Sequence, residues 1–442
     1  MTLLRLWIAL LLLAVVVWAQ PPTAPQVPEA AKASAHFDAK VATDAWLATM
    51  SGKEKANSDG YFEGGYWLIL WDFLYAVGVL ILLLETKVSA RIRDWTERLV
   101  KAKFLQSWLY WVGFSAAVYL FSFPITVYEG YFREHQYGLS NLSFSGWFRQ
   151  EMTALALSIV FGGLAFTALV ALVRKLPNTW HLWGTLVGIA FVCVAIVVGP
   201  VFISPLFNKY KPLENQAIKQ SIWSLARANG IPATDVYEVD ASKQSKRVSA
   251  NVSGFLGTER ITLNDNLLAR CSPQAILSTM GHEMGHYVLH HIYNAVIFFT
   301  LVISLMFWLL RLGLDRALAR WGERWHLRGV TDVAALPVAL IILSTIGFLF
   351  TPLGNSFTRQ QEYEADMYGI NAARQPDGEA EVDLLLGEYR KMDPGPLEET
   401  IFFDHPSGRT RIYAAMRWKA ENLCLFDSAL ACTNPPPVIE KR

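Results

Sequence analysis

The stretch Gly281-His282-Glu283-Met284-Gly285-His286 decides how the rest of this chain is interpreted. Two histidines four residues apart on a helix lie on the same face, one turn above the other. Both imidazoles can therefore point at one metal ion, with Glu283 beside them. This H-E-x-x-H arrangement supplies two nitrogen ligands for zinc and a carboxylate placed to take a proton from water. The other interpretation is an ordinary helix that carries two histidines.

The composition indicates a membrane protein. The chain has 442 residues, of which 53% are hydrophobic and 17% charged. These proportions are too apolar for an ordinary soluble protein, so we expect the lipid bilayer as a partner. The formal net charge of +1 gives no field that would favour nucleic acid. The sequence contains neither a Walker-type phosphate loop nor a suitable dinucleotide-binding glycine motif, so we expect no nucleotide either.

Six apolar runs are long enough to span a bilayer as helices. They lie at residues 65–84, 107–128, 152–173, 182–203, 292–310 and 333–353. Ahead of them, residues 1–20 place an apolar run between an early arginine and small residues, which favours a secretory signal peptide over an uncleaved anchor. The one ionisable residue inside a run is Asp72, which we expect near a helix end, in reach of interfacial water.

These runs predict a mainly α-helical multi-pass membrane protein. With the H-E-x-x-H segment, we also expect a zinc metallopeptidase domain, and this domain should contain a small β-hairpin or sheet. We expect five segments along the chain. They are a signal peptide or N-terminal anchor at 1–20, an extramembrane segment at 21–64, a membrane domain of four spans at 65–205, a metallopeptidase domain with the other two spans at 206–420, and a C-terminal tail at 421–442.

Basic residues are concentrated in three short loops, at 85–106, 174–181 and 311–332. Alternate crossing of six spans places all three loops on one side, which their Lys and Arg content predicts to be cytoplasmic. The H-E-x-x-H segment and the C-terminal region then lie on the exported side of what we expect to be a bacterial inner membrane. Cys424 and Cys432 would share that side and can form a disulfide, although two unpaired thiols fit equally well.

A catalytic zinc site needs a third protein ligand. The metzincin pattern would place a histidine six residues after His286, but that residue is Ile292, so this class is excluded. The best candidate is the acidic segment at 359–366, where Glu362 and Asp366 share a helix face. One of them can bind the metal while the other supports a ligand histidine from behind. The other interpretation of this segment is a solvated helix face.

The segment from Lys246 to Leu263 predicts two short strands joined through Gly254 and Gly257. Its alternating small apolar residues suit a half-buried edge strand. An edge strand beside a zinc site can bind an extended peptide by adding it to the sheet. An ordinary structural hairpin would have the same pattern.

Taken together, these segments resemble the type I CAAX prenyl protease family of integral-membrane zinc metalloproteases, in the gluzincin class. The resemblance covers residues 175–415 well and the preceding spans loosely. It is carried by H-E-x-G-H-x-x-x-x-H at His282–His291, E-[FY]-x-A-D at Glu362–Asp366 and H-P-x-x-x-x-R at His405–Arg411, with shorter matches at 205–209, 239–242, 250–251 and 260–261.

The resemblance implies that His282, His286 and Glu362 bind one zinc ion and that Glu283 is the general base. The fold that it implies is a ring of helices around an internal chamber.

The same resemblance implies two supporting pairs of residues. Asn251 and His405 would contact the peptide backbone at the scissile bond. Asp366 and Arg411 would support the site behind the metal ligands.

Two departures limit how far the resemblance carries. The basic loops place the site on the exported side, whereas the family's eukaryotic members face the cytosol, and an envelope protein would not meet prenylated substrates. We therefore expect hydrolysis of a peptide or protein substrate, in protein processing or membrane-protein quality control. One alternative is a site-2-type intramembrane protease, but the polar residues on both sides of the motif disfavour it. The other is a non-catalytic transporter or chaperone-like membrane protein, which the intact Glu283 disfavours.

Overall fold

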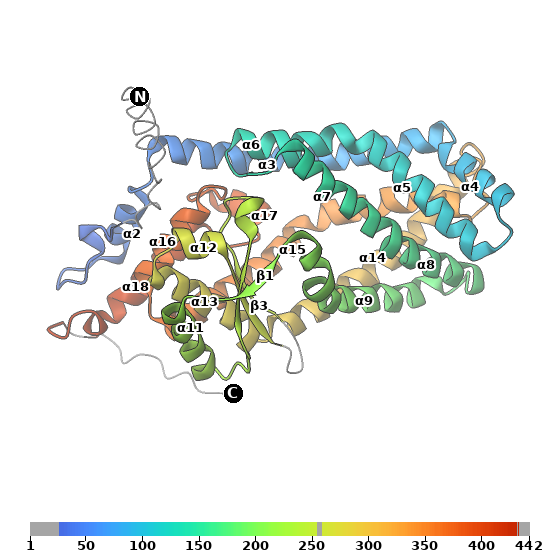
Figure 1. Ribbon diagram of the computed structural model, residues 1–442. Helices are drawn as coiled ribbons and strands as arrows, with labels where there is room; N and C mark the ends of the chain where they lie inside the picture. Colours follow the sequence, from blue (N-terminus) through green and yellow to red (C-terminus); the bar gives the residue numbers. More distant parts are fainter. Residues whose placement is uncertain (1–25, 254–258, 431, 433–442) are drawn as a thin grey trace, which may run out of the picture.

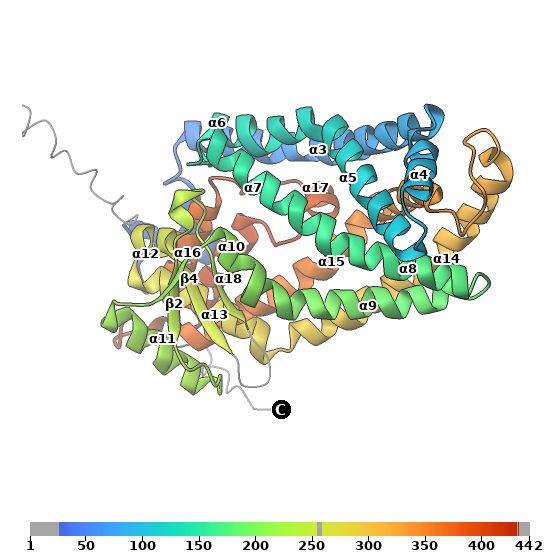
Figure 2. The same ribbon diagram turned by 45° about the vertical axis from the view of Figure 1, so that its right-hand side comes forward.

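Long helices that run side by side make up most of the molecule (Figure 1). The structure is a computed structural model and describes residues 26–253, 259–430 and 432. At one end the long helices are joined by short connections, and at the other they meet a smaller α/β part that contains the H-E-x-x-H segment (Figures 1 and 2). The expected signal peptide or anchor at 1–20 lies outside the described residues.

Among the described residues, five helical stretches are long and apolar enough to cross a membrane. The sixth expected run, 182–203, corresponds to α9 (Trp180–Val198), whose described apolar part ends at Val194. Five of the six expected spans are therefore confirmed in the described residues, and the sixth corresponds to a shorter described apolar helix that continues into a π-helical turn at Gly199. The five stretches are α3 (Gly52–Glu85); α5 (Lys103–Val127) continued through a π-helical turn into α6 (Glu134–Gln136); α7 (Phe144–Leu157) continued through a second such turn into α8 (Gly163–Lys175); α14 (His291–Trp321); and α15 (Leu336–Ala373) with the 3₁₀ turn Val333–Ala335 before it.

Helix α3 begins well before its apolar run. Ser51 accepts a hydrogen bond from the N–H of Glu54, whose carboxylate accepts one from the N–H of Ser51, and this capping box starts the helix. The boundary expected at residue 64 falls inside this helix, because hydropathy marks only where apolar residues begin. The expectation for Asp72 is wrong for the same reason: it lies in the middle of α3, where it interacts with Glu129 of the neighbouring helix.

The three basic loops meet at one end of the long helices. The first loop forms helix α4 (Val88–Leu99), and its Arg93 lies 2.5 Å from Asp332 of the third loop. From the second loop, Arg174 donates a hydrogen bond of 3.1 Å to the hydroxyl of Ser107, just after the first loop. The prediction that these loops share one side of the molecule is therefore in agreement with the structure.

The α/β part contains a four-stranded sheet with helices packed against it. Its strands are β1 (Tyr210–Pro212), β2 (Val236–Val239), β3 (Ala250–Ser253) and β4 (Arg260–Asn264). Its helices are α2 (Ala39–Leu47), α10 (Ser204–Phe207), α11 (Gln216–Ala228), α12 (Asp265–Arg270), α13 (Pro273–Val288), α16 (Pro376–Leu386), α17 (Pro396–Phe402) and α18 (Gly408–Glu421).

The strand order β1-β2-β4-β3 places β3 at an edge. Strand β3 pairs antiparallel with β4, β4 pairs parallel with β2, and β2 pairs antiparallel with β1. The two strands expected in 246–263 are therefore present, with one at an edge, while Gly254 and Gly257 lie outside the described residues. Strands β1 and β2 were not expected. Inward side chains of β4, Ile261 and Leu263, are buried against α13, which fixes that helix on the sheet.

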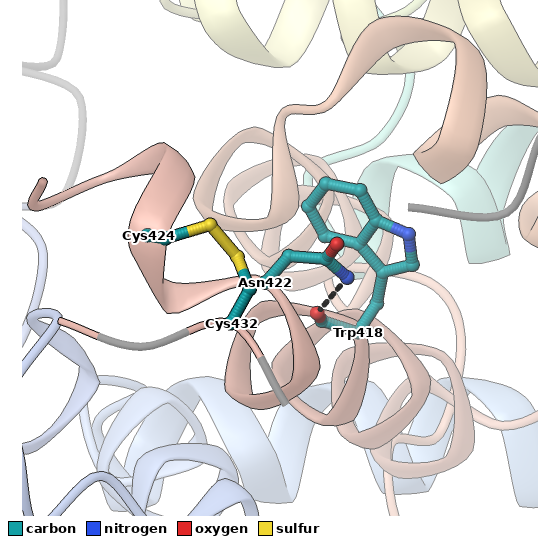
Figure 3. Close-up of a disulfide and its surroundings, with 4 residues drawn as sticks. All are labelled: Trp418, Asn422, Cys424 and Cys432. Atoms are coloured by element: carbon teal, nitrogen blue, oxygen red, sulfur yellow. Dashed lines mark hydrogen bonds between the residues drawn. A yellow bond between two sulfur atoms is a disulfide. The ribbon is translucent and has the colours of Figure 1, made fainter. Parts of the chain in front are cut away.

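A disulfide joins Cys424 to Cys432 in the segment after α18 (Figure 3). The two Cα atoms lie 5.1 Å apart, within the ordinary range for such a bridge. Beside it, the Asn422 side chain donates a hydrogen bond of 2.8 Å to the backbone carbonyl of Trp418. The sequence left open either a disulfide or two unpaired thiols, and the structure has the disulfide.

Candidate metal centre

Helix α13 carries the H-E-x-x-H segment, and its position follows from its own sequence. The hydroxyl of Ser272 accepts a hydrogen bond from the N–H of Ala275, and Pro273 occupies the first turn, so the helix start is well defined. Met280 and Met284 are fully buried in the core beneath the sheet. The two histidines of the H-E-x-x-H segment face α15 instead.

Three glycines let α13 and α15 approach backbone to backbone. A Cβ atom on Gly281 would lie 2.9 Å from the carbonyl oxygen of Gly369, and one on Gly285 would lie 3.1 Å from the Cα of Ala365. In the other direction, a Cβ on Gly369 would lie 2.6 Å from the amide nitrogen of His282. The glycine inside the H-E-x-G-H motif is thus explained by packing, and the contact brings the acidic segment of α15 against the histidines.

The ligand atoms of His282, His286 and Glu362 all lie within 4.8 Å of one another. The two Nε2 atoms are 3.1 Å apart, and the carboxylate oxygens of Glu362 lie 3.2 Å from Nε2 of His282 and 3.6 Å from Nε2 of His286. Oε2 of Glu362 is buried and accepts no hydrogen bond from the part of the chain that the structure describes. Ligands bound to zinc at about 2.0–2.1 Å in a tetrahedron lie about 3.3–3.4 Å apart. The donor set therefore fits a zinc ion.

The other ring nitrogens of both histidines are already occupied. Nδ1 of His282 lies 2.7 Å from Oδ1 of Asp366, and Nδ1 of His286 lies 2.8 Å from Nδ1 of His291. His291 in turn lies 3.3 Å from Glu364. Partners of this kind fix ring orientation and tautomer, so that each Nε2 faces the shared centre. The place of Asp366 agrees with the role implied for it, whereas the place of His291 was not expected.

Arg411 holds a group of buried carboxylates behind the histidines. Its guanidinium lies 2.6 Å from Asp366, 3.1 Å from Glu379 and 2.9 Å from Asp383, and all four side chains are buried. Glu379 and Asp383 come from α16 and were missed by the sequence reasoning, since nothing in their local spacing marks them. Burial raises the pKa of Asp383 well above its usual range, which reduces the negative charge that Arg411 has to balance.

Glu283 lines a cavity of about 170 Å³ beside the three ligand atoms. Its carboxylate accepts no hydrogen bond from another residue that the structure describes. Burial raises the pKa of Glu283, because the charged form loses water. A carboxylate that faces a cavity, lacks a protein partner and has a raised pKa is suited to accept a proton from water in that cavity.

The two residues expected to contact substrate lie on different sides of this region. His405 lines the cavity, with Nε2 3.2 Å from Glu362 and Nδ1 2.8 Å from Asp404. Burial tends to raise the pKa of Asp404, but the hydrogen bond with His405 and the charges of His405 and Arg390 together outweigh this and lower it. Asn251 lies on the exposed edge strand β3, which contacts α13. The structure thus brings His405 to the ligand atoms and Asn251 to the adjacent sheet edge.

Two histidines and a glutamate around one point, a free glutamate at the cavity and five helices of membrane length define a membrane-embedded metallopeptidase. The comparisons with known proteins agree. Residues 212–419 match the family model described as peptidase family M48, and residues 48–209 match that of the CAAX prenyl protease N-terminal part, with five membrane helices. The chain belongs to peptidase family M48, whose members are in general zinc-dependent.

The chain is also similar to two relatives and to one solved structure. It is 31% identical over 355 residues to the uncharacterized metalloprotease YhfN of Bacillus subtilis, covering 78% of this chain and 82% of that protein. It is 30% identical over 312 residues to CAAX prenyl protease 1 of Saccharomyces cerevisiae, covering 67% of this chain and 68% of that protein. The fold is similar to the crystal structure of S. mikatae Ste24p, with a TM-score of 0.71, 22% identity, and coverage of 83% and 89% of the two chains.

Proposed function

We propose that this chain is a zinc endopeptidase of a bacterial inner membrane, that His282, His286 and Glu362 hold the metal, and that Glu283 is the general base. The observation that carries the proposal is that the ligand atoms of His282, His286 and Glu362 lie within 4.8 Å of one another, next to a cavity-lining glutamate. Zinc bound there would polarise the scissile carbonyl and lower the pKa of water.

The chain's own residues account for the proton transfers. Glu283 takes a proton from the attacking water and delivers it to the leaving amine, for which a pKa raised toward neutrality is suited. His405 is placed by Asp404 to donate a hydrogen bond from Nε2 as negative charge develops on the carbonyl oxygen. Arg411 and Asp366 keep His282 oriented through both steps.

The sheet edge offers a place for the substrate. Strand β3 has one pairing edge taken by β4 and ends the sheet on the other side. An extended peptide added there would be held by backbone hydrogen bonds, with the exposed side chain of Asn251 beside it. We propose extended segments of envelope or membrane proteins as substrates, and we do not carry over the prenylated substrates that the names of the eukaryotic relatives print.

A site-2-type arrangement finds no support in this geometry. Helix α13 is not one of the apolar helices that could cross a membrane, and the third ligand position is taken by a glutamate rather than an aspartate. The proposed site therefore lies outside the apolar part of the helices.

The test of hydrolysis is Glu283→Gln in the purified full-length chain. We expect this variant to retain one zinc per chain and to lose about 10²–10⁴-fold in peptide turnover. Glu323→Gln in a basic loop at the far end is the matched control and should match the wild type. Turnover near wild type in Glu283→Gln would remove Glu283 as the base, and wild-type protein that binds zinc but cleaves no peptide would favour a non-catalytic role.

We further propose that the site faces the exported side of the membrane. The three basic loops lie together at the end of the long helices away from the metal centre, and the excess of positive charge favours the cytoplasm for that end. The Cys424–Cys432 disulfide lies in the α/β part at the other end, and disulfides persist in oxidising compartments.

Cysteine labelling in intact cells tests this orientation. In a background without native thiols, Arg417→Cys on the exposed face of α18 should react with a membrane-impermeant maleimide. Arg316→Cys in a basic loop should react only after the membrane is permeabilised. The reverse pattern would show that the site faces the cytoplasm.

A further inference from the structure

A row of hydrogen bonds joins the start of the edge strand β3 to the segment that follows the membrane helix ending in α6. The N–H of Lys246 donates a hydrogen bond of 3.1 Å to the carbonyl of Leu139, and the N–H of Asn141 donates one of 2.8 Å to the carbonyl of Gln244. The side chain of Asn141 donates a third, of 2.7 Å, to the carbonyl of Ser242. The chain therefore enters β3 directly from a contact with the membrane part.

Arg247 follows this contact and is held through both its backbone and its side chain. Its carbonyl accepts hydrogen bonds of 2.7 and 3.0 Å from the buried side-chain amides of Asn264 and Asn266, at the end of β4 and in α12. One nitrogen of its guanidinium lies 2.9 and 3.1 Å from the two carboxylate oxygens of Glu134 on α6, and 2.8 Å from the hydroxyl of Tyr61 on α3. One residue thus links the sheet to two membrane helices.

The partners of this guanidinium also bind each other. The Tyr61 hydroxyl donates a hydrogen bond of 2.6 Å to Glu134, and the guanidinium of Arg133 lies 4.0 Å from the centre of the Tyr61 ring. Hydrogen bonds to a charged group are about twice as strong as neutral ones. Losing Arg247 should therefore loosen the start of β3, while the backbone hydrogen bonds before it keep the chain folded there.

Arg247 lies next to the wall of the cavity beside the metal centre. Its guanidinium carbon lies 5.3 Å from the centre of the Tyr389 ring, and Tyr389 lines that cavity. The cavity is also lined by the next residues along the chain, Val248, Ser249 and Ala250, which lead into β3. A shift of this segment would therefore move the cavity wall and the free strand edge together.

We propose that Arg247 is a positioning residue, which holds the start of β3 against α3 and α6 so that the strand edge and the cavity wall are in place to bind substrate. This inference rests on the proposed function, in which an extended peptide pairs with β3. The guanidinium is engaged by Glu134 and Tyr61 and not by the metal ligands. Its loss should therefore weaken substrate binding and leave the chemical step unchanged.

The experiment measures kcat and KM of the zinc-loaded full-length chain with quenched fluorescent peptides of mixed sequence. In Arg247→Met we expect KM to rise about three- to tenfold, with kcat within about twofold of the wild type. Arg247→Lys keeps a positive charge opposite Glu134 and should recover part of the loss. Glu134→Gln should raise KM in the same way, and the double variant should be no worse than either single variant, because both remove the same link.

Arg409→Met is the matched control. The side chain of Arg409 is 38% exposed, against 39% for Arg247, and it pairs with Asp44 on α2. This variant should leave both kinetic constants unchanged. Hydrogen exchange should be faster at residues 248–253 in Arg247→Met and unchanged in α13. An unchanged KM in Arg247→Met, or a loss of kcat and zinc in place of a rise in KM, would refute the positioning role, as would effects of the two single substitutions that multiply in the double variant.

Peptide binding separates this inference from the proposed hydrolysis. In zinc-loaded Glu283→Gln, fluorescence anisotropy gives the Kd of the same peptides without turnover. Adding Arg247→Met to that variant should raise Kd by the factor seen in KM, and an unchanged Kd would refute the role of Arg247 alone. Zinc-loaded wild type that binds the peptides but cleaves none of them would refute the proposed hydrolysis instead.

Discussion

Replacing Gly369 by alanine tests whether the approach of two helix backbones builds the metal centre. The added Cβ would lie 2.6 Å from the amide nitrogen of His282 and 2.9 Å from its Cα, whereas ordinary contacts begin at 3.4 Å. Both neighbours are backbone atoms, so no side chain can rotate away. Helices α13 and α15 must therefore separate by about 0.8 Å at this level.

That separation is large compared with what a metal site tolerates. Glu362 lies on α15 and the two histidines on α13, so the shift moves one ligand away from the other two. Metal–ligand distances are held to about ±0.2 Å, so we expect zinc affinity to fall by more than tenfold. Overpacking should also cost about 1–3 kcal/mol of stability, against a gain of about 0.5–1 kcal/mol from alanine in a helix.

Gly354 supplies the control on the same helix. A Cβ there would meet no atom within 4 Å, so Gly354→Ala should keep zinc and unfold at or above the wild-type temperature. Zinc affinity would be measured by chelator competition and stability by thermal unfolding of the metal-free chain in detergent. The two glycines are thus expected to differ in the sign of the stability change. Wild-type zinc affinity in Gly369→Ala would refute the idea that this contact positions Glu362.

Four further outcomes follow from the same region. Arg411→Met leaves buried carboxylates without a counter-charge and should lower the free energy of unfolding, measured by thermal unfolding, by about 3–5 kcal/mol. Arg417→Met, on the exposed face of the same helix, should lower it by about 0.5 kcal/mol or less, and equal losses in the two variants would contradict the buried network. Glu362→Gln should abolish stoichiometric zinc in metal analysis, and full occupancy would assign the third ligand elsewhere. Asn251→Ala should lower peptide kcat/KM without removing zinc, and unchanged kinetics would leave that side chain no part in substrate binding. Burial raises the pKa of the Cys271 thiol to about 12, so iodoacetamide at pH 8 should modify this thiol only after the protein unfolds. Rapid alkylation of Cys271 in the folded protein, detected by mass spectrometry, would contradict this burial.

The features that could be predicted from the sequence are those set by short spacings. Residues four apart on a helix are neighbours whatever surrounds them, which is why the pair His282 and His286 and the pair Glu362 and Asp366 could be placed on common faces. Hydropathy likewise locates apolar runs, because the bilayer sets their length. Neither signal reports where a helix continues into water. The polar first turns of α3 were therefore assigned to an extramembrane segment, although Ser51 and Glu54 have the spacing of a capping box in the sequence.

The features that could not be predicted are contacts between separate elements. His291 reaches His286 only because the chain turns at His290, which adopts a positive φ of 59° between α13 and α14. Two of the three carboxylates that hold Arg411 come from α16, some thirty residues away in the chain, and carry no spacing pattern of their own. Local periodicity reports the face of a helix, whereas such partners depend on how the helices dock.

The length of α15 ties the proposed site to the membrane surface. One continuous helix contains both the apolar run that ends near Leu353 and the third ligand position at Glu362. At 1.5 Å per residue these two positions lie about 14 Å apart along the axis. The headgroup regions add only about 5–8 Å on each side of the hydrocarbon core, so the centre lies about 6–9 Å beyond them along the helix axis. A peptide bond that reaches Glu283 must therefore pass close to the bilayer, which favours segments of membrane-attached proteins over freely diffusing peptides as substrates.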